Sequence, residues 1–573
     1  MAMWAGGLAT LVGCGVRPPS GQAPSSPPGA ESVSGISADE LFQLALDNLE
    51  HLEKYHVGQM LQQVVERLNQ WIKFQHRPDH WRPDPLISRL PKQYQELPSV
   101  RKVAELEFPL EDGYVLLAAL WTRDLAKWIS GQTPDELQQA QKLFDWTVRN
   151  IQLQPAGGEG PAYWRQLPWE TLLLGRGSSL DRAWVFILLA RQLGIEAFLI
   201  ALAPIEEQQS AGEVPWAVGV LRENEIYVFD PTLGIPIPGP EGVQKGAKGG
   251  LEILPASLRQ LADNPLLLRR LDLGPQERYP VASVDLARAV ALIAALPAEL
   301  SLRMQMVESR LVGGGWMSLS VQPSQLAERI KAAGGVRDVK LWTRPFTIAW
   351  QRQQQAQDRE FALWHTSVMA PFWIQRAEPP PRRRTQDPQE NLSSTQVVRE
   401  PILPLWRGRV AHLRGNLSGE RGASYFYHLA RPPESELNIA VAEGKMPLPV
   451  RDLFLRAKQD ASYWLGLVCF DLGEYQAALD YFQKRCLELW PDGPWRSGAY
   501  YNLGRTYEAL AQYEQAIRSY EADPQAPDHY GRRLRARWIK EHFLSETGSP
   551  SSVEKSPSPP PLSKDSSKAP SSK

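Results

Sequence analysis

The chain has 573 residues, more than one hydrophobic core usually serves, and its length predicts about three or four domains. Apolar residues make up 43% of it and charged residues 22%, as in ordinary globular proteins. The net charge of −1 gives no electrostatic reason to expect a nucleic-acid partner, because nucleic acid selects a concentrated basic surface.

The amino terminus combines a short apolar run with a cysteine. Leu11-Val12-Gly13-Cys14 resembles the lipobox of bacterial lipoproteins, which implies a signal over 1–14 and lipidation of Cys14. Residues 15–36 are rich in Pro, Ser and Gly and predict a disordered tether. Because no Lys or Arg precedes the apolar run, a disordered cytoplasmic leader is the alternative. We expect a protein of the bacterial cell envelope, attached to the membrane through lipid only.

Residues 37–130 are predicted to form a helical amino-terminal region. Apolar residues recur at helical spacing over 37–75, and Ser37 and Glu40 form a capping-box pattern at the start. Further on, Thr133-Pro134-Asp135-Glu136 combines an N-cap, a first-turn proline and acids that complement the helix dipole. It predicts a helix that continues to Asn150.

Two stretches within 131–240 resemble the core of the transglutaminase-like family, a papain-related α+β fold with a Cys–His–Asp triad. They are GRGSSLDRAWVFILLARQLGI at 175–195 and VPWAVGVLRENEIYVFDPTLG at 214–234. The family pattern is G-x-C-x-D-x-A before an apolar helix, and H-x-W before a strand that ends in D-P-T. On that pattern Ser179 stands at the nucleophile position, Val214 at the base position and Asp230 at the position of the acid.

The residues at the triad positions predict that this domain is not catalytic. None of the nine histidines lies between Trp81 and Trp364, and Val214 can accept no proton. Each remaining residue also has a structural interpretation: Ser178 or Ser179 can cap the following helix, and Asp230 can cap a turn. We expect no catalytic residue, no cofactor and no metal. The alternative is a hydrolase or acyltransferase that uses Ser179 with an unidentified base.

The middle of the chain carries weaker patterns. A glycine-rich insertion at 238–250 precedes a helical and α/β region at 250–376, in which we expect a long helix over 284–311. A strand, a helix and a strand are then expected at 316–321, 323–334 and 337–343. The polar, proline-rich stretch 377–396 predicts a linker, and 397–447 is expected to be a β-rich or irregular connection.

An internal repeat lies within 448–545. Its two copies are 38 residues apart and resemble a tetratricopeptide repeat of about 34 residues with a longer connecting loop. The residues that match and are expected to pack the helices are Leu465, Gly466, Tyr475, Ala478, Phe482, Leu503, Gly504, Tyr513, Ala516 and Tyr520. Two repeats bury little on their own, so we expect flanking helices near 450–457 and 532–543. The Ser/Pro/Lys-rich segment 546–573 predicts a disordered tail.

Together these patterns predict a multidomain α+β protein. It comprises a helical amino-terminal region, a transglutaminase-like α+β core, a small α/β segment and an all-α repeat domain. The predicted function is a non-catalytic interaction or scaffold lipoprotein whose repeats bind a protein or peptide. A cytoplasmic scaffold with an unmodified Cys14 is the alternative, and the oligomeric state stays open.

Overall fold

The computed structural model describes residues 37–52, 57–155, 165–204, 212–246, 249–355, 358–377 and 401–544. The predictions for Cys14, the tether at 15–36 and the tail at 546–573 lie outside these residues, as does nearly all of the linker at 377–396. Across the described part of the chain, no helix has the length and apolar character needed to cross a membrane.

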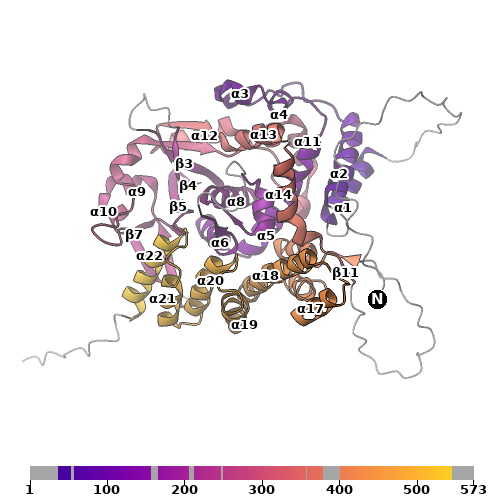
Figure 1. The fold of residues 1–573 in the computed structure, drawn as a ribbon. Helices are drawn as coiled ribbons and strands as arrows, with labels where there is room; N and C mark the ends of the chain where they lie inside the picture. Colours follow the sequence, from indigo (N-terminus) through magenta and orange to yellow (C-terminus); the bar gives the residue numbers. More distant parts are fainter. Residues whose placement is uncertain are drawn as a thin grey trace, which may run out of the picture.

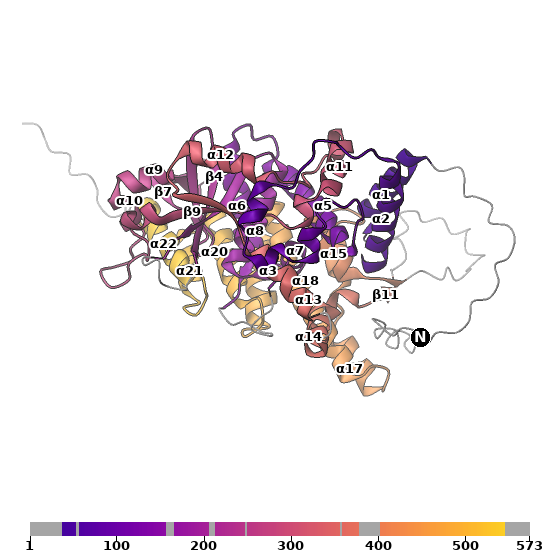
Figure 2. The ribbon, with the colours of Figure 1, turned by 90° about the horizontal axis from the view of Figure 1, so that it is seen from above.

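The amino-terminal region is helical, as predicted. Helix α1 (Ala38–Glu50) begins at the expected capping box, in which Glu40 N donates to Ser37 Oγ and Ser37 N donates to a Glu40 carboxylate oxygen. Helix α2 (Val57–Trp71) packs against α1, and both contact the long helix α5 (Leu110–Ser130). Helices α1 and α2 lie at one end of the molecule, and α9 (Leu258–Asp263) and α10 (Pro265–Arg269) lie at the other (Figures 1 and 2).

A six-stranded sheet forms the centre of the molecule. Its spatial order is β10 (Asp338–Leu341), β9 (Ala289–Ile293), β3 (Glu196–Leu202), β4 (Val214–Arg222), β5 (Glu225–Asp230) and β6 (Ile235–Pro236). Strands β9 and β10 are parallel and the other neighbours are antiparallel. Helix α8 (Ser179–Gln192) packs on this sheet and also contacts α5 and α6 (Glu136–Asn150). Nearly every residue of α8 is buried, which is why its sequence is apolar on all sides.

The small α/β segment is present, but two of its elements were predicted wrongly. The long helix expected over 284–311 is replaced by a 3₁₀ helix (Ser283–Arg288), strand β9, a second 3₁₀ helix (Ala298–Leu300) and α11 (Leu302–Arg310). Strand β9 is buried throughout between two neighbours, and such a strand is a continuous apolar run that periodicity does not separate from a helix. Residues 316–321 form no strand. The unit is therefore β9, α12 (Pro323–Ala333) and β10, and it extends the central sheet.

The prediction for 397–447 was also wrong. Apart from a two-residue strand, Pro401–Ile402, the segment contains α15 (Pro404–Leu413), α16 (Ala423–Leu429) and α17 (Glu434–Ala442). These helices are 10, 7 and 9 residues long, too short for a clear helical period. Glycines and prolines separate them, and those residues also predict turns. The glycine-rich insertion in turn forms a hairpin of β7 (Pro238–Lys245) and β8 (Leu251–Pro255).

The carboxyl-terminal region is an array of antiparallel helices, as the repeat pattern predicts. Helix α18 (Leu448–Asp471) pairs with α19 (Tyr475–Asp480), which continues as a π-helix to Glu488. Helix α20 (Arg496–Ala509) pairs with α21 (Tyr513–Glu521). Helix α22 (His529–Ile539) packs against α21 at the end of the array. The expected helix at 450–457 is the beginning of α18 rather than a separate element. A Cβ on Gly466 would lie 2.6 Å from the Phe482 ring, and one on Gly504 would lie 2.6 Å from the Tyr520 ring. This close approach explains the glycine–aromatic pairs of the repeat.

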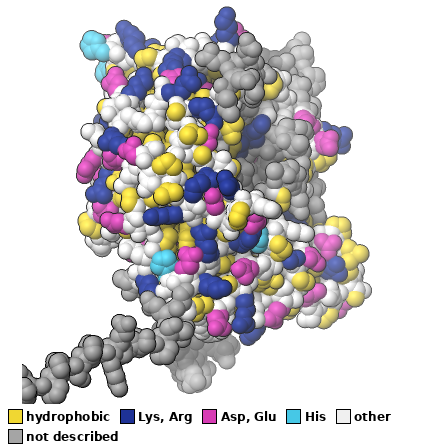
Figure 3. All heavy atoms as spheres, turned by 90° about the vertical axis from the view of Figure 1, so that its left-hand side faces the viewer, with side chains coloured by type: hydrophobic (Ala, Val, Ile, Leu, Met, Phe, Trp, Pro, Cys, Tyr) yellow, Lys and Arg dark blue, Asp and Glu magenta, His cyan; other side chains and the backbone are white. Residues whose placement is uncertain are grey.

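The array lies directly below the central domain (Figure 1). Helices α18, α20 and α22 are nearer to α5, α6 and the sheet, and α19 and α21 lie on the outer side. The face that includes α9, α10 and the end of the array carries acidic and basic side chains side by side (Figure 3).

Candidate functional site

Helix α8 begins at the nucleophile position of the triad. Ser178, not Ser179, is its N-cap: Asp181 N donates to Ser178 Oγ at 3.3 Å, and Ser178 N donates to Asp181 Oδ2 at 2.8 Å. The second carboxylate oxygen of Asp181 pairs with Arg344, the first residue of α13 (Arg344–Gln355), at 2.5 Å. These contacts account for Ser178 and Asp181 as the fixed start of a buried helix.

Ser179 is the first residue of α8 and is half-buried. Among the described residues, no side chain, that of a histidine included, forms a hydrogen bond with its hydroxyl. His365, on α14 (Arg359–Met369), instead places Nε2 3.1 Å from a carboxylate oxygen of Glu170. A hydroxyl at a helix start without a base is a weak nucleophile.

Val214 begins β4 at the base position, opposite Leu202 of β3. Val214 is 62% exposed, so the position faces solvent without a side-chain group that could take a proton. The next residue, Pro215, cannot do so either.

Asp230 is retained at the end of β5, but its carboxylate is fully engaged. One oxygen accepts from the backbone N–H groups of Thr232 (2.8 Å) and Leu233 (2.9 Å), which confirms the predicted turn cap. The other accepts from the Tyr279 hydroxyl at 2.7 Å, and that hydroxyl accepts from Trp216 Nε1 at 2.6 Å. A phenol therefore binds the acid that would orient a histidine in the triad.

Burial determines the protonation states of Asp230 and Tyr279 in this series of hydrogen bonds. It raises the pKa of Asp230, against the opposing effect of the Tyr279 hydrogen bond and the two backbone donors. It also raises the pKa of Tyr279 well above its usual value, with the Asp230 charge acting in the same direction. Tyr279 thus stays a hydrogen-bond donor. No sequence pattern predicts the role of Tyr279, because it is a single aromatic residue in a connecting segment, outside any periodic pattern.

Arg182 holds several parts of the domain together behind the helix start. Its guanidinium donates to the carbonyl oxygens of Ile151 (2.7 Å), Val148 (3.2 Å) and Pro231 (3.3 Å). It also lies 3.6 Å from a carboxylate oxygen of Asp528, at the start of α22. One buried side chain thus joins the end of α6, the turn after β5 and the repeat array.

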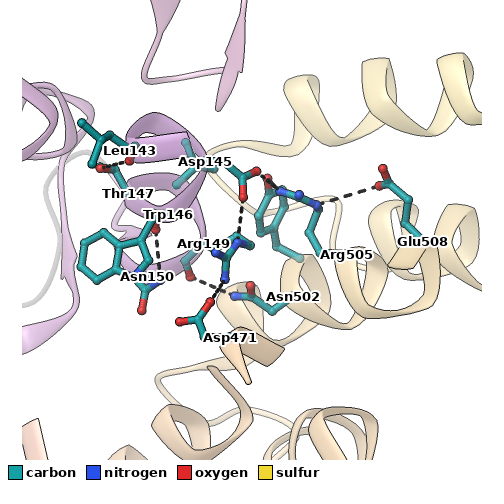
Figure 4. Close-up of polar contacts among 12 residues, drawn as sticks. Leu143, Asp145, Trp146, Thr147, Arg149, Asn150, Asp471, Asn502, Arg505 and Glu508 are labelled. Carbon is teal, nitrogen blue, oxygen red and sulfur yellow. Dashed lines mark hydrogen bonds and ion pairs between the residues drawn. The ribbon is translucent and has the colours of Figure 1, made fainter. Parts of the chain in front are cut away.

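A buried polar network joins the transglutaminase-like domain to the repeats (Figure 4). Arg149, near the end of α6, pairs with Asp145 at 3.0 Å and with Asp471 of α18 at 2.8 Å. Asp145 in turn pairs with Arg505 of α20 at 2.5 Å. Burial alone would raise the pKa of Asp145, but Arg505 and Arg149 together hold it below its usual range. The Asn502 side-chain amide completes the contact by donating to the Arg149 carbonyl at 3.0 Å.

Strand β1 (Gln152–Leu153) makes a further contact with the loop before α20 and with the first turn of α20. The Gln152 side chain donates to the Pro494 carbonyl at 2.8 Å and accepts from Gly498 N at 2.6 Å. The first helices of the repeat hairpins are therefore bound to the protein's own core. A partner of the repeats would need another surface of the array.

The side chains of the described ranges offer no group of His, Cys, Asp and Glu residues suited to a metal ion.

Comparison with protein families identifies two segments of the chain. A model of the transglutaminase-like superfamily matches residues 123–212, and a tetratricopeptide repeat model matches residues 459–522. The first match includes Ser179 and ends before Val214. Searches of curated proteins and of solved structures gave no match. The chain thus contains a transglutaminase-like domain and a tetratricopeptide repeat region, a kind of repeat that generally mediates protein–protein interactions.

Proposed function

We propose that this protein is a non-catalytic interaction scaffold, in which a transglutaminase-like domain without a working triad supports the repeat array. The observation that carries the proposal is the state of the triad positions. Val214 can take no proton, and Asp230 is bound to Tyr279 through a 2.7 Å hydrogen bond. Both conditions remove the activation that a nucleophile at Ser179 would require.

The test uses the full chain and covalent probes directed at serine and cysteine nucleophiles. We expect no labelling of Ser179 and the same background for Ser179→Ala. As a matched control, Ser367→Ala removes a hydroxyl from an exposed site on α14. Labelling that disappears in Ser179→Ala and persists in Ser367→Ala would favour a hydrolase or acyltransferase instead.

We also propose that the protein is attached to the bacterial cell envelope through lipid on Cys14. The support is the lipobox-like Leu11-Val12-Gly13-Cys14 and the polar, Pro- and Ser-rich stretch that follows it. Incorporation of labelled palmitate that disappears in Cys14→Ser is the expected result. Equal incorporation, or none in either protein, would favour the cytoplasmic alternative.

The partner in this proposal is a protein or peptide. Since α18, α20 and α22 face the protein's own core, the partner would contact the outer helices or the junction between domain and array. A pull-down from membrane extracts with a variant that lacks 450–545 tests whether the array is required.

A further inference from the structure

A cavity of about 390 Å³ lies where the transglutaminase-like domain, α14 and α18 meet. Its volume falls within the range of about 300–1,000 Å³ that is usual for small-ligand sites. Arg176 lines it from β2 (Arg176–Gly177), just before the start of α8, and Arg456 and Asp460 line it from α18. It is therefore shared between the domain and the repeat array.

The cavity has aromatic walls that are held in place by their neighbours. Trp495 is stacked on Tyr463 with the ring centres 4.3 Å apart and the planes 9° apart, and it meets Trp464 edge to face. Trp464 is also stacked on Phe372. Trp464 and Trp495 are almost fully buried and form a fixed base, while half-buried Trp364 and Val368 of α14 give the lining its accessible apolar surface.

Two guanidinium groups line this cavity outside ion-pair distance of any described carboxylate, although, against the effect of burial, the charges of both act to lower the pKa of Asp460 in the same lining. Arg176 is half-buried and lies 5.9 Å from the centre of the Trp495 ring, and Arg456 is exposed at the rim. Within the described ranges, no carboxylate comes within ion-pair distance of either one. Asp460, the acid of the lining, accepts a hydrogen bond from Trp495 Nε1 at 2.7 Å. The lining thus holds two positive charges and one negative charge, and it favours an anion.

The remaining polar groups match a peptide. The side-chain amides of Gln154, Gln166 and Gln459 also line the cavity, and amides can both donate to and accept from a peptide backbone. A free organic acid has no peptide group, so it has no N–H to donate to the oxygens of these amides.

We propose that this cavity binds the carboxyl terminus of a peptide that ends in an apolar or aromatic residue. Arg176 and Arg456 take the carboxylate, the tryptophan walls take the last side chain, and the glutamine amides take the preceding peptide group. This deepens the proposed scaffold role and rests on it. The test reads binding rather than turnover, so its failure is distinct from a failure of the Ser179 experiment.

The experiment is isothermal titration of the full chain with N-acetyl-Gly-Phe and with N-acetyl-Gly-Phe amide, which lacks only the carboxylate charge. Because a charge-assisted hydrogen bond is worth about 1.5–3 kcal/mol, the free acid should bind at least about tenfold more tightly than the amide. Arg176→Gln should weaken the binding of the free acid by a similar factor and leave the binding of the amide unchanged. Arg518→Gln, on the exposed face of α21, is the matched control and should bind like the unaltered protein.

Several outcomes would overturn the proposal: no binding of the acid, equal binding of acid and amide, or an Arg176→Gln variant that binds the acid normally. If 3-phenylpropanoate binds as tightly as the peptide, the site takes a free organic acid and the peptide assignment is wrong. Arg456→Gln, at the exposed rim, provides a second variant should Arg176→Gln fail to fold. Arg456→Gln should weaken the binding of the acid more than that of the amide. Equal effects on the two affinities would contradict the role given to the two arginines.

Discussion

Glu508→Gln tests the buried ion pair that joins α20 to α22 and the contact of the repeat array with the β7–β8 hairpin. The Glu508 side chain is 4% exposed, and Arg535 donates to its two oxygens at 2.7 and 2.8 Å. The same carboxylate accepts from the Tyr520 hydroxyl at 2.9 Å and from Leu251 N, in the β7–β8 hairpin, at 2.8 Å. Burial alone would raise the pKa of Glu508, but Arg535 keeps it below its usual value, so the pair is ionised.

The neutral amide leaves the Arg535 guanidinium buried without its counter-charge. Removing one partner of a buried pair costs about 3–5 kcal/mol, whereas an exposed pair is worth about 0–1 kcal/mol. Glu514→Gln is therefore the matched control, since its partner Arg518 is 77% exposed.

The assay is urea denaturation followed by tryptophan fluorescence, together with hydrogen exchange to locate the loss. We expect a lower free energy of unfolding for Glu508→Gln, with faster exchange in β8, α20 and α22. If the free energies of unfolding of Glu508→Gln and Glu514→Gln differ by less than about 1 kcal/mol, the ion pair does not stabilise the contact between α20 and α22 in the way the distances indicate.

Three further variants test other parts of the structure. Gly504→Ala should destabilise the array by about 1–3 kcal/mol, because the new methyl group meets an aromatic ring at 2.6 Å; Gly314→Ala, where a Cβ meets nothing within 4 Å, should be neutral in the same denaturation assay. Tyr279→Phe should cost about 1–3 kcal/mol by leaving buried Asp230 without one of its donors, as read by thermal unfolding. Burial lowers the pKa of His412 from 6.5 to about 4, so the unfolded chain binds this proton first as the pH falls. Stability should drop by about 3 kcal/mol between pH 6.5 and 4, and His412→Gln should flatten that part of the pH–stability curve.

Each of these has a contrary result. Equal stabilities of the two glycine variants would show that the helix hairpin can move apart without cost. Partly exposed Tyr475 provides the control for the phenol, since Tyr475→Phe should change the melting temperature less than Tyr279→Phe. If the pH–stability curve of His412→Gln falls between pH 6.5 and 4 as steeply as that of the unaltered protein, protonation of His412 is not coupled to unfolding.

The sequence was sufficient to predict those features in which a residue type at a given spacing has one common structural role. The repeat glycines at 466 and 504 predicted close helix contacts, and the structure places each against an aromatic ring. Ser37 with Glu40 predicted a capping box, and Asp230 predicted a turn cap. These are local rules, so a short stretch of chain contains all the information they need.

The features that the sequence did not predict depend on contacts with distant parts of the chain. Strand β9 looks like part of a helix because its environment is apolar on both faces, and only its neighbours β3 and β10 decide between the two. Helices α15 to α17 are too short to show a period and form because the array and α5 cover them. Tyr279, 49 residues after Asp230 in the chain, could be linked to it only through the fold.

The residues at and beside the triad positions stabilise the fold independently of any reaction. Ser178 and Asp181 start a buried helix, Asp230 closes a turn, and Arg182 binds that turn together with the first residues of α22. Each contact stabilises the fold directly, and none depends on a reactive Ser179. The same end of the domain also receives the repeat array through Arg149 and Gln152. A substitution that rebuilt a base at Val214 would still face an acid already bound to a tyrosine, and so would require Tyr279 to change as well.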